Sequence, residues 1–169
     1  MSRQIELYPG APEGKPCPYG DPFAALPTSW VLCGPTGSGK TMGLLNLILK
    51  FYKNMFDRVF AVSPSIHLDP QYKVLKEHLE KYCDPKKEQL AFEDWDHAAI
   101  GKILDTQREI VESCRKRKVA APHCHLLLDD MGDFTDLMQA RKGAKIGGSW
   151  MTTLATKGRH FQVSWMVTC

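Results

Sequence analysis

Long apolar runs are missing from this sequence. No window of about 18 consecutive apolar residues occurs, and the best candidate, residues 42–51, is too short and contains Asn46 and Lys50. Residues 1–6 also lack the apolar core and the small-residue cleavage site of a secretory signal. We therefore expect no membrane span and an intracellular location.

Closely paired cysteines are missing as well. The six cysteines show no short paired spacing, which is typical of reduced thiols; they stand at positions 17, 33, 83, 114, 124 and 169. The run His123-Cys124-His125 puts three potential metal ligands together, but a tetrahedral zinc site needs a second pair at suitable spacing. His78 with Cys83 is only a loose match, so the pattern disfavours a zinc site.

Extremes of composition and charge are also absent. The chain has 169 residues, 43% of them hydrophobic and 24% charged, which is typical of one globular domain. The net charge is only +3, but residues 114–169 carry nine basic and four acidic side chains. This excess suits a polyanionic partner, although solvated basic faces are common without one.

The composition of the chain changes near residue 28, from a segment rich in proline and glycine to one with apolar runs. Residues 8–28 hold six of the eleven prolines, which indicates an extended Pro/Gly-rich arm over residues 1–28 and a domain over residues 29–169. Apolar runs in this domain predict strands, and helical spacing predicts helices: strands at 30–33, 59–62, 126–128 and 161–168, helices at 42–51, 70–83, 94–118 and 149–158. This alternation predicts the α/β class, with a mostly parallel sheet flanked by helices.

A glycine-rich motif follows the first predicted strand and opens a helix. It satisfies the pattern G-x-x-x-x-G-K-[ST], with the residues Gly34, Pro35, Thr36, Gly37, Ser38, Gly39, Lys40 and Thr41. Glycines let backbone N–H groups turn toward a triphosphate, and the positive end of the helix adds to the attraction. Lys40 is expected to reach the β and γ phosphates and the Thr41 hydroxyl to bind Mg²⁺. The motif predicts ATP and Mg²⁺ as cofactors; the alternative is a turn without a ligand.

Two carboxylates end the third predicted strand, in the run His125-Leu126-Leu127-Leu128-Asp129-Asp130. Asp129 is expected to hold the Mg²⁺ shell, directly or through water, and Asp130 to polarise the attacking water as general base. An aspartate reaches one methylene less than the glutamate often found in this role. The alternative is a strand end capped by two solvated acids.

A third motif, Lys157-Gly158-Arg159-His160, enters the fourth predicted strand 29 residues after Asp130. Taken together, GPTGSGKT, LLLDD and KGRHF resemble the motifs of DNA-packaging ATPases of large double-stranded DNA viruses, the poxvirus-type branch of the FtsK–HerA superfamily. The resemblance covers most of residues 29–169. The choice of this family depends mainly on the Gly-Arg-His entry and on its distance from the acids.

The resemblance implies a P-loop NTPase fold with a RecA-like core. In that core the strands at 126–128 and 161–168 are neighbours, and the phosphate-loop strand lies beside the latter. The family's polar sensor, often glutamine, has no counterpart up to Cys169, so either the chain is truncated or the sensor is absent; a fifth core strand, expected by analogy, is not found in the sequence either. The resemblance also makes Arg159 an arginine finger near the phosphates, commonly at a subunit interface; the alternative is a surface arginine capping a helix C-terminus.

The implied function is ATP hydrolysis coupled to translocation and packaging of double-stranded viral DNA. The implied partners are double-stranded DNA, further copies of the chain in a ring (a hexamer or a pentamer) and capsid components. The implied location is the virus factory of an infected cell, or the virion. Two alternatives remain: a non-hydrolysing nucleotide-binding module, and a small-molecule kinase, which needs an acid soon after the second strand, where only Asp69 stands.

Two basic groups are candidates for DNA contact. The run Arg115-Lys116-Arg117-Lys118 ends a predicted helix, where the helix dipole favours cations without any ligand. The second group follows the acids in a glycine-containing segment and consists of Arg141, Lys142 and Lys145. For this second group, DNA contact and a mobile surface loop both remain open.

Overall fold

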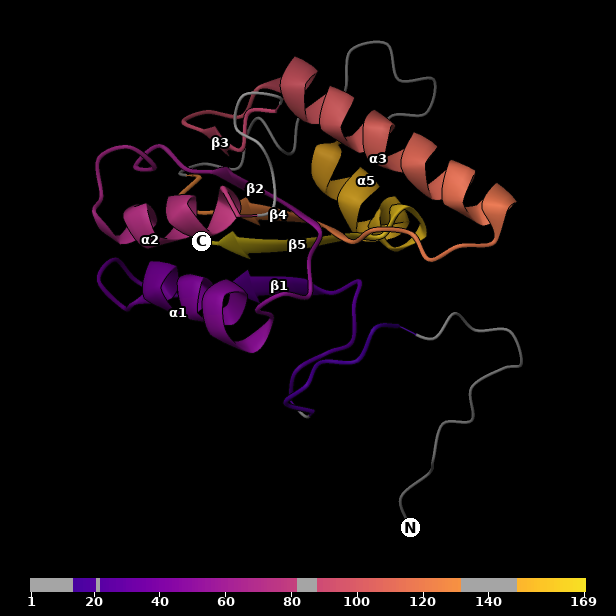
Figure 1. Ribbon diagram of the computed structural model, residues 1–169. Coiled ribbons are helices and arrows are strands. Elements are labelled where there is room, and N and C mark those ends of the chain that lie inside the picture. The colour runs from indigo at the N-terminus through magenta and orange to yellow at the C-terminus, as the bar shows by residue number, and fades with distance from the viewer. Residues whose placement is uncertain (1–13, 21, 82–87, 132–148) are drawn as a thin grey trace.

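A five-stranded, entirely parallel sheet forms the centre of the molecule (Figure 1). The computed structural model describes residues 14–20, 22–81, 88–131 and 149–169. The strand order is β1-β5-β4-β2-β3, and the strands are β1 (Ser29–Leu32), β2 (Arg58–Val62), β3 (Ala91–Phe92), β4 (Cys124–Leu128) and β5 (Val163–Thr168). The α/β class and the parallel sheet predicted from the sequence are confirmed.

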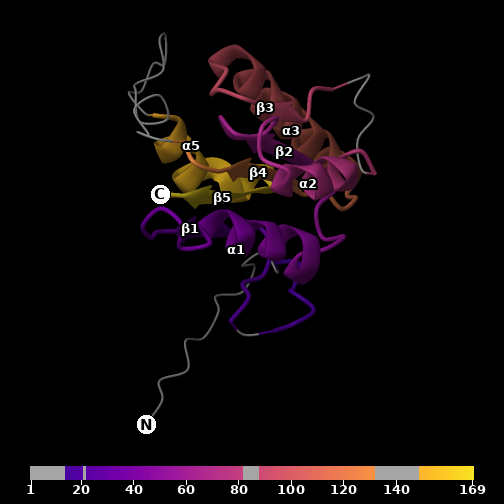
Figure 2. The same ribbon diagram turned by 90° about the vertical axis from the view of Figure 1, so that its left-hand side faces the viewer.

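Helices cover both faces of the sheet, as the alternation of elements predicts. They are α1 (Lys40–Asn46), α2 (Gln71–Leu79), α3 (His97–Arg117) and α5 (Trp150–Lys157). In Figures 1 and 2, α1 and α2 lie on one face, and α3 and α5 on the other. This division follows from right-handed crossovers, because the chain crosses the sheet in one direction up to β3 and then returns. Among the helices in the described ranges, none is both long and apolar enough to cross a membrane.

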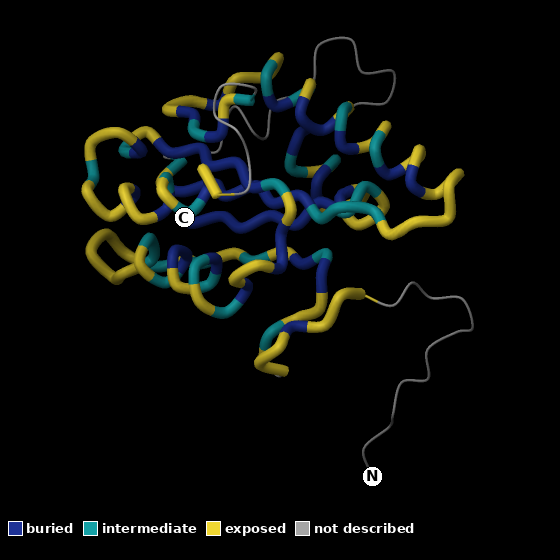
Figure 3. The backbone as a smooth tube through the Cα atoms, viewed as in Figure 1, coloured by how far each residue is buried: buried dark blue, intermediate teal, exposed yellow. Residues whose placement is uncertain are grey.

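Two inner strands are buried along their whole length (Figure 3). They are β4, which the two acids follow, and β5, which the Lys157–His160 motif precedes. β4 and β5 pair in register from Cys124 opposite Val163 to Leu128 opposite Val167. β1 pairs with the other side of β5. The neighbours implied by the family resemblance are therefore the neighbours observed. Since all strands run the same way, the sheet has a carboxyl edge, where strands end, and an amino edge, where they begin.

Several boundaries differ from the sequence-based expectation. The helix expected at residues 42–51 is α1 followed by a π-helix over Leu47–Phe51. The strand expected from residue 161 begins at Val163, because residues 158–161 form a 3₁₀ helix, η2 (Gly158–Phe161), and Gln162 has a left-handed φ of 56°. The two-residue strand β3 was not expected, because it is too short to show a pattern.

The described part of the proline-rich segment folds back onto the domain instead of extending from it. Lys15 and Leu26 form an antiparallel bridge, and the Leu26 side chain is buried. The ring of Phe23 stacks on that of Phe51, with centroids 4.3 Å apart, and Lys15 Nζ donates to the Met55 carbonyl at 3.0 Å. Residues 14–20 and 22–28 thus contribute to the core around the π-helix.

Candidate functional site

The glycine-rich motif forms a loop between β1 and α1 at the carboxyl edge. Gly39, the N-cap of α1, has a φ of 83°, a backbone conformation that residues other than glycine rarely adopt. Gly34 is crowded instead, since a Cβ there would lie 2.7 Å from Ser38 Oγ. Among the described side chains, none caps the first turn of α1, so its first amide N–H groups are available to another acceptor. The loop has the local geometry of an anion cradle.

Lys40 folds back over this loop. Its Nζ atom donates to the carbonyl oxygen of Gly34 at 2.7 Å and to that of Pro35 at 3.1 Å. The ammonium group is therefore held at the loop by two of the loop's own carbonyl oxygens. Thr41 follows in the first turn of α1 and is half-buried. The structure thus places both expected phosphate and metal contacts at the same loop.

Asp129 is fully buried just after β4, and its carboxylate accepts hydrogen bonds on both oxygens. The Tyr72 hydroxyl donates to one oxygen and the Thr168 hydroxyl to the other. Tyr72 comes from α2 and Thr168 from the last position of β5. Among the described residues, no cation pairs with Asp129. A buried carboxylate without a positive partner is costly, so this group suits a bound cation.

The Tyr72 hydroxyl links the acid to a neighbouring strand. Its oxygen lies 3.0 Å from Ser63 Oγ at the end of β2, and because the phenol proton goes to Asp129, Ser63 donates to Tyr72. Burial raises the pKa of Tyr72 well above its ordinary value, and the hydrogen bond to Asp129 adds to the effect. The phenol is therefore a stable donor at neutral pH.

Asp130 turns away from the buried strand. Its φ of 52° is left-handed, a conformation that aspartate tolerates better than most residues, and its side chain is exposed. Its backbone N–H donates to Thr168 Oγ1 at 2.9 Å. Thr168 thus joins the two acids, since its hydroxyl accepts from Asp130 and donates to Asp129. The result is one carboxylate held inside the fold and one presented at its surface.

The loop and the acids lie at one edge and are separated by a single strand. β5 lies between β1 and β4, so the two strand axes are about 10 Å apart. The residues expected from the sequence to bind phosphate, metal and attacking water are therefore brought together.

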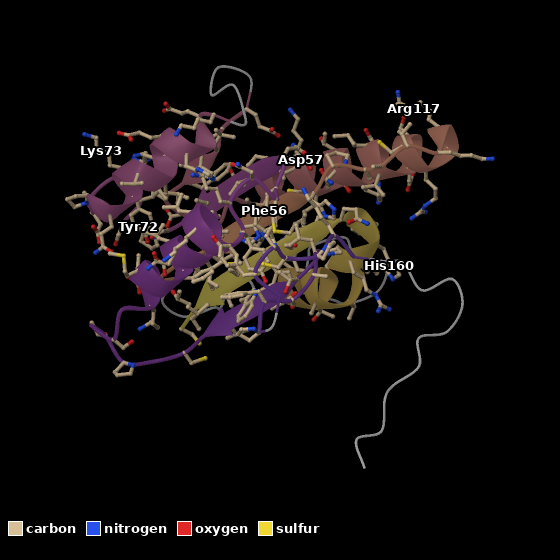
Figure 4. All side chains as sticks on the ribbon, turned by 60° about the horizontal axis from the view of Figure 1, so that its bottom comes forward. Phe56, Asp57, Tyr72, Lys73, Arg117 and His160 are labelled. Atoms are coloured by element: carbon tan, nitrogen blue, oxygen red, sulfur yellow. The ribbon has the colours of Figure 1, made fainter. Side chains whose placement is uncertain are left out.

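Arg159 is not part of this cluster. It is exposed in η2, before β5 begins, and so lies at the amino edge. With six residues in β5, the two edges are about 20 Å apart. Figure 4 shows the separation through Tyr72, near the acids, and His160, next to Arg159, at opposite ends of the molecule. A finger acting on the phosphate loop of its own chain is incompatible with this geometry.

A second polar cluster holds η2 in place at the amino edge. The fully buried Gln107 of α3 donates from Nε2 to the Pro122 carbonyl at 2.7 Å and to the Phe161 carbonyl at 3.2 Å. Arg58 donates to Gln107 Oε1 at 3.0 Å and pairs with Glu88. Every polar atom of the Gln107 amide therefore has a partner.

Sequence reasoning missed Tyr72, Thr168 and Ser63. Tyr72 precedes Asp129 by 57 residues and belongs to an ordinary amphipathic helix, so no local signal marks it. Thr168 did carry a signal, because a hydroxyl ends an otherwise mostly apolar strand next to the acid strand. The basic run Arg115–Lys118 lies exposed at the end of α3 and just after it, whereas Arg141, Lys142 and Lys145 lie outside the described residues.

The segment His123–His125 lies at and within the start of β4. Cys124 and His125 are buried, and burial lowers the pKa of His125 to about 3, so this imidazole is neutral. Among the residues that the structure describes, no three His, Cys, Asp or Glu side chains gather in a metal-binding group.

The fold combines a parallel sheet, a glycine-rich loop of the phosphate-binding pattern after one strand, and a buried acid after another. These features define the α/β P-loop class, and comparison with known families identifies the family within it. The family model described as Poxvirus A32 protein matches residues 21–169, and the chain belongs to this family of viral DNA-packaging ATPases of the FtsK–HerA type. Neither the curated proteins nor the solved structures contain a match. The family is one of virus-infected cells.

Proposed function

We propose that this chain binds ATP with Mg²⁺ at the carboxyl edge, hydrolyses it, and couples the hydrolysis to translocation of double-stranded viral DNA. The observation that carries the proposal is the placement of the Gly34–Thr41 loop and the Asp129–Asp130 pair on either side of β5. Membership of the A32 family supports a packaging ATPase in general. The coupling of ATP hydrolysis to DNA translocation in this chain is the further step that we propose.

The loop's own residues account for phosphate binding. Backbone N–H groups at the start of α1 would donate to a bound anion, and the Lys40 ammonium would exchange the carbonyls of Gly34 and Pro35 for phosphate oxygens. The exchange is favourable because a charged acceptor binds an ammonium group more strongly than a carbonyl does.

Thr41 and Asp129 would hold the magnesium ion. Both offer oxygen ligands, which Mg²⁺ prefers, and the buried Asp129 carboxylate has no cationic partner among the described residues. When bound, the ion supplies charge neutralisation of the phosphate oxygens. Tyr72 and Thr168 orient the carboxylate, because each donates a hydrogen bond to one of its two oxygens.

Asp130 would orient and deprotonate the attacking water. Its carboxylate is exposed at the carboxyl edge, while its backbone is fixed to Thr168. A base in this position accepts a proton as the water attacks the γ-phosphate.

Arg159 would serve a neighbouring copy of the chain. Because it lies at the opposite edge from its own phosphate loop, only a second chain can bring it to a γ-phosphate. A ring of such chains places each amino edge against the next carboxyl edge. We propose this ring, with DNA and capsid components as partners, in the virus factory or the virion.

An ATPase assay with and without double-stranded DNA tests the proposal. We expect phosphate release that DNA stimulates and that Asp130→Asn suppresses by about 100-fold or more, while Mg·ATP affinity changes little. A small-molecule kinase would show slow release that DNA leaves unchanged. A non-hydrolysing nucleotide-binding module would bind ATP without releasing phosphate. Either of these two results would contradict the proposal of a DNA-translocating ATPase.

A further inference from the structure

Two exposed thiols lie against each other at the start of the phosphate loop. Cys33 follows β1 directly and Cys169 follows β5 directly, and their Sγ atoms are 2.8 Å apart. The last registered pair of these strands is Leu32 with Thr168, so the cysteines occupy the next position along the ladder.

Backbone hydrogen bonds hold the two cysteines at this spacing. The Cys169 N–H donates to the Leu32 carbonyl at 3.0 Å, and the Gly34 N–H donates to the Cys169 carbonyl at 3.1 Å. Neighbouring parallel strands are about 4.8 Å apart, within the Cα separation of about 4.4–6.8 Å found in disulfides. Bond formation therefore needs only side-chain rotation.

The other described cysteines are placed differently. Cys17, Cys114 and Cys124 are buried, and the Cys17 thiol bonds to the Phe51 carbonyl. A dissolved reagent therefore reaches the Cys33–Cys169 pair before any of these three thiols.

The pair adjoins the residues that hold the ligand-free loop. Cys33 precedes Gly34, whose carbonyl accepts the Lys40 ammonium at 2.7 Å. Nucleotide binding requires this ammonium to leave the carbonyl. A Cys33–Cys169 cross-link would fix the backbone beside Gly34, and with it the carbonyl that holds the ammonium, against adjustment to a bound triphosphate.

We propose that Cys33 and Cys169 are a reversible oxidation site, and that their disulfide lowers the affinity of the phosphate loop for nucleoside triphosphate. The oxidant is a low-molecular-weight disulfide such as glutathione disulfide. One cysteine thiolate attacks it, forming a mixed disulfide and releasing one small thiol. The second thiolate attacks the protein sulfur of that mixed disulfide, forming the Cys33–Cys169 bond and releasing the other small thiol. The two protein thiols lose two electrons and two protons in all, and the small disulfide is reduced to two thiols.

The chemical part of the proposal is tested without nucleotide. The chain is treated with glutathione disulfide, its native thiols are titrated, and its peptides are mapped by mass spectrometry. We expect the loss of two thiols and a peptide pair linked through Cys33 and Cys169, both reversed by dithiothreitol. Unchanged thiols, separate glutathione adducts or a different linked pair would overturn it.

The functional part rests on the proposed nucleotide binding and is tested by calorimetry with a non-hydrolysable ATP analogue. We expect oxidation to raise Kd by about threefold or more, and reduction to restore it. Cys33→Ser and Cys169→Ser remove this response, whereas Cys17→Ser, a buried thiol with the same change, retains it. An unchanged Kd in the cross-linked chain overturns this part. Absence of binding in the reduced chain would instead refute the proposed function and leave the thiol chemistry standing.

Discussion

The two edges of the sheet are each organised by one buried polar side chain, but the two side chains are satisfied differently. At the amino edge, the neutral Gln107 amide is matched by two carbonyls and Arg58. At the carboxyl edge, the Asp129 carboxylate is met, within the part of the chain that the structure describes, by the hydroxyls of Tyr72 and Thr168 and by no cationic side chain. The first cluster is complete by itself, whereas the second leaves a carboxylate that a bound cation would balance. The comparison separates an edge whose buried polar group is fully paired from the edge where we propose that a ligand binds.

The largest expected effect tests whether the two edges meet between chains. In the assembled protein with DNA, Arg159→Ala should lower turnover by about 10³ or more, because a finger stabilises charge on the transferring phosphoryl group. Mixing it with Lys40→Ala protein should restore activity, since mixed interfaces pair an intact loop with an intact finger. His160→Ala, an exposed neighbour in η2, is the control. Full turnover by Arg159→Ala alone would reject the finger, and loss without rescue would contradict action between chains.

The next effect concerns the loop at the carboxyl edge. Lys40→Ala should weaken ATP binding by about 100-fold or more, because charge-assisted contacts to phosphate are lost while the core is untouched. Lys50→Ala, which removes an exposed lysine just beyond the same helix, should leave the affinity unchanged. Calorimetry measures both, and equal affinities in the two variants would refute the assignment of the loop.

Tyr72→Phe tests whether the hydroxyls around Asp129 serve the cation. It removes one donor to the carboxylate, so about tenfold more Mg²⁺ should be needed for nucleotide binding, while magnesium-free binding stays the same. Tyr52→Phe is the matched control, because Tyr52 is equally buried but bonds to the Ala24 carbonyl, remote from the acids. The Mg²⁺ dependence of binding, measured with Mn²⁺ as a spectroscopic substitute, distinguishes the variants. An identical dependence in both would show that Tyr72 is structural only.

The smallest effect concerns His125, which lies within β4 between the two edges. Neither of its ring nitrogens has a hydrogen-bond partner among the described residues, and burial lowers its pKa to about 3. Its pKa in the unfolded chain is about 6.5, so below that pH the unfolded state takes up a proton that the folded state refuses. The stability contributed by neutral His125 is therefore present above pH 6.5 and is lost as the pH falls toward 3.

His125→Phe provides the measurement, because a phenyl ring keeps the contact with Phe56 and does not titrate. Between pH 7.5 and pH 5, the unfolding free energy of the original chain should fall by about 2 kcal/mol more than that of the variant. Urea denaturation at the two pH values checks this. A difference that does not change with pH would show that the imidazole is protonated in the folded state.

Much of the carboxyl edge was predictable because its signals are local. The loop motif, the strand before it and the acids after Leu128 each follow from short patterns, and parallel strands bring their ends to one edge. Tyr72 was not predictable, because its contact with Asp129 depends on how α2 packs on the sheet. The π-helix over Leu47–Phe51 was also hidden, since its apolar pattern does not differ from that of an α-helix.

The position of Arg159 shows a signal that was available and not used. It precedes its strand, whereas the phosphate loop and the acids follow theirs. In a parallel sheet, residues before a strand and residues after a strand lie at opposite edges. Because Arg159 comes before its strand in the sequence, it is predicted to lie away from the phosphate loop of its own chain. It can therefore act on the phosphate loop of another chain or on none.

The phosphate loop and the acids also differ in how firmly the sheet holds them. β1 is an edge strand of four residues, alternately exposed and half-buried, and within the described ranges it pairs only with β5. β4 is buried throughout and pairs on both sides. Local opening costs less at an edge than at the centre of a sheet. For the nucleotide binding that we propose, the loop after β1 is therefore the part expected to adjust, while Asp129 after β4 is expected to keep its position.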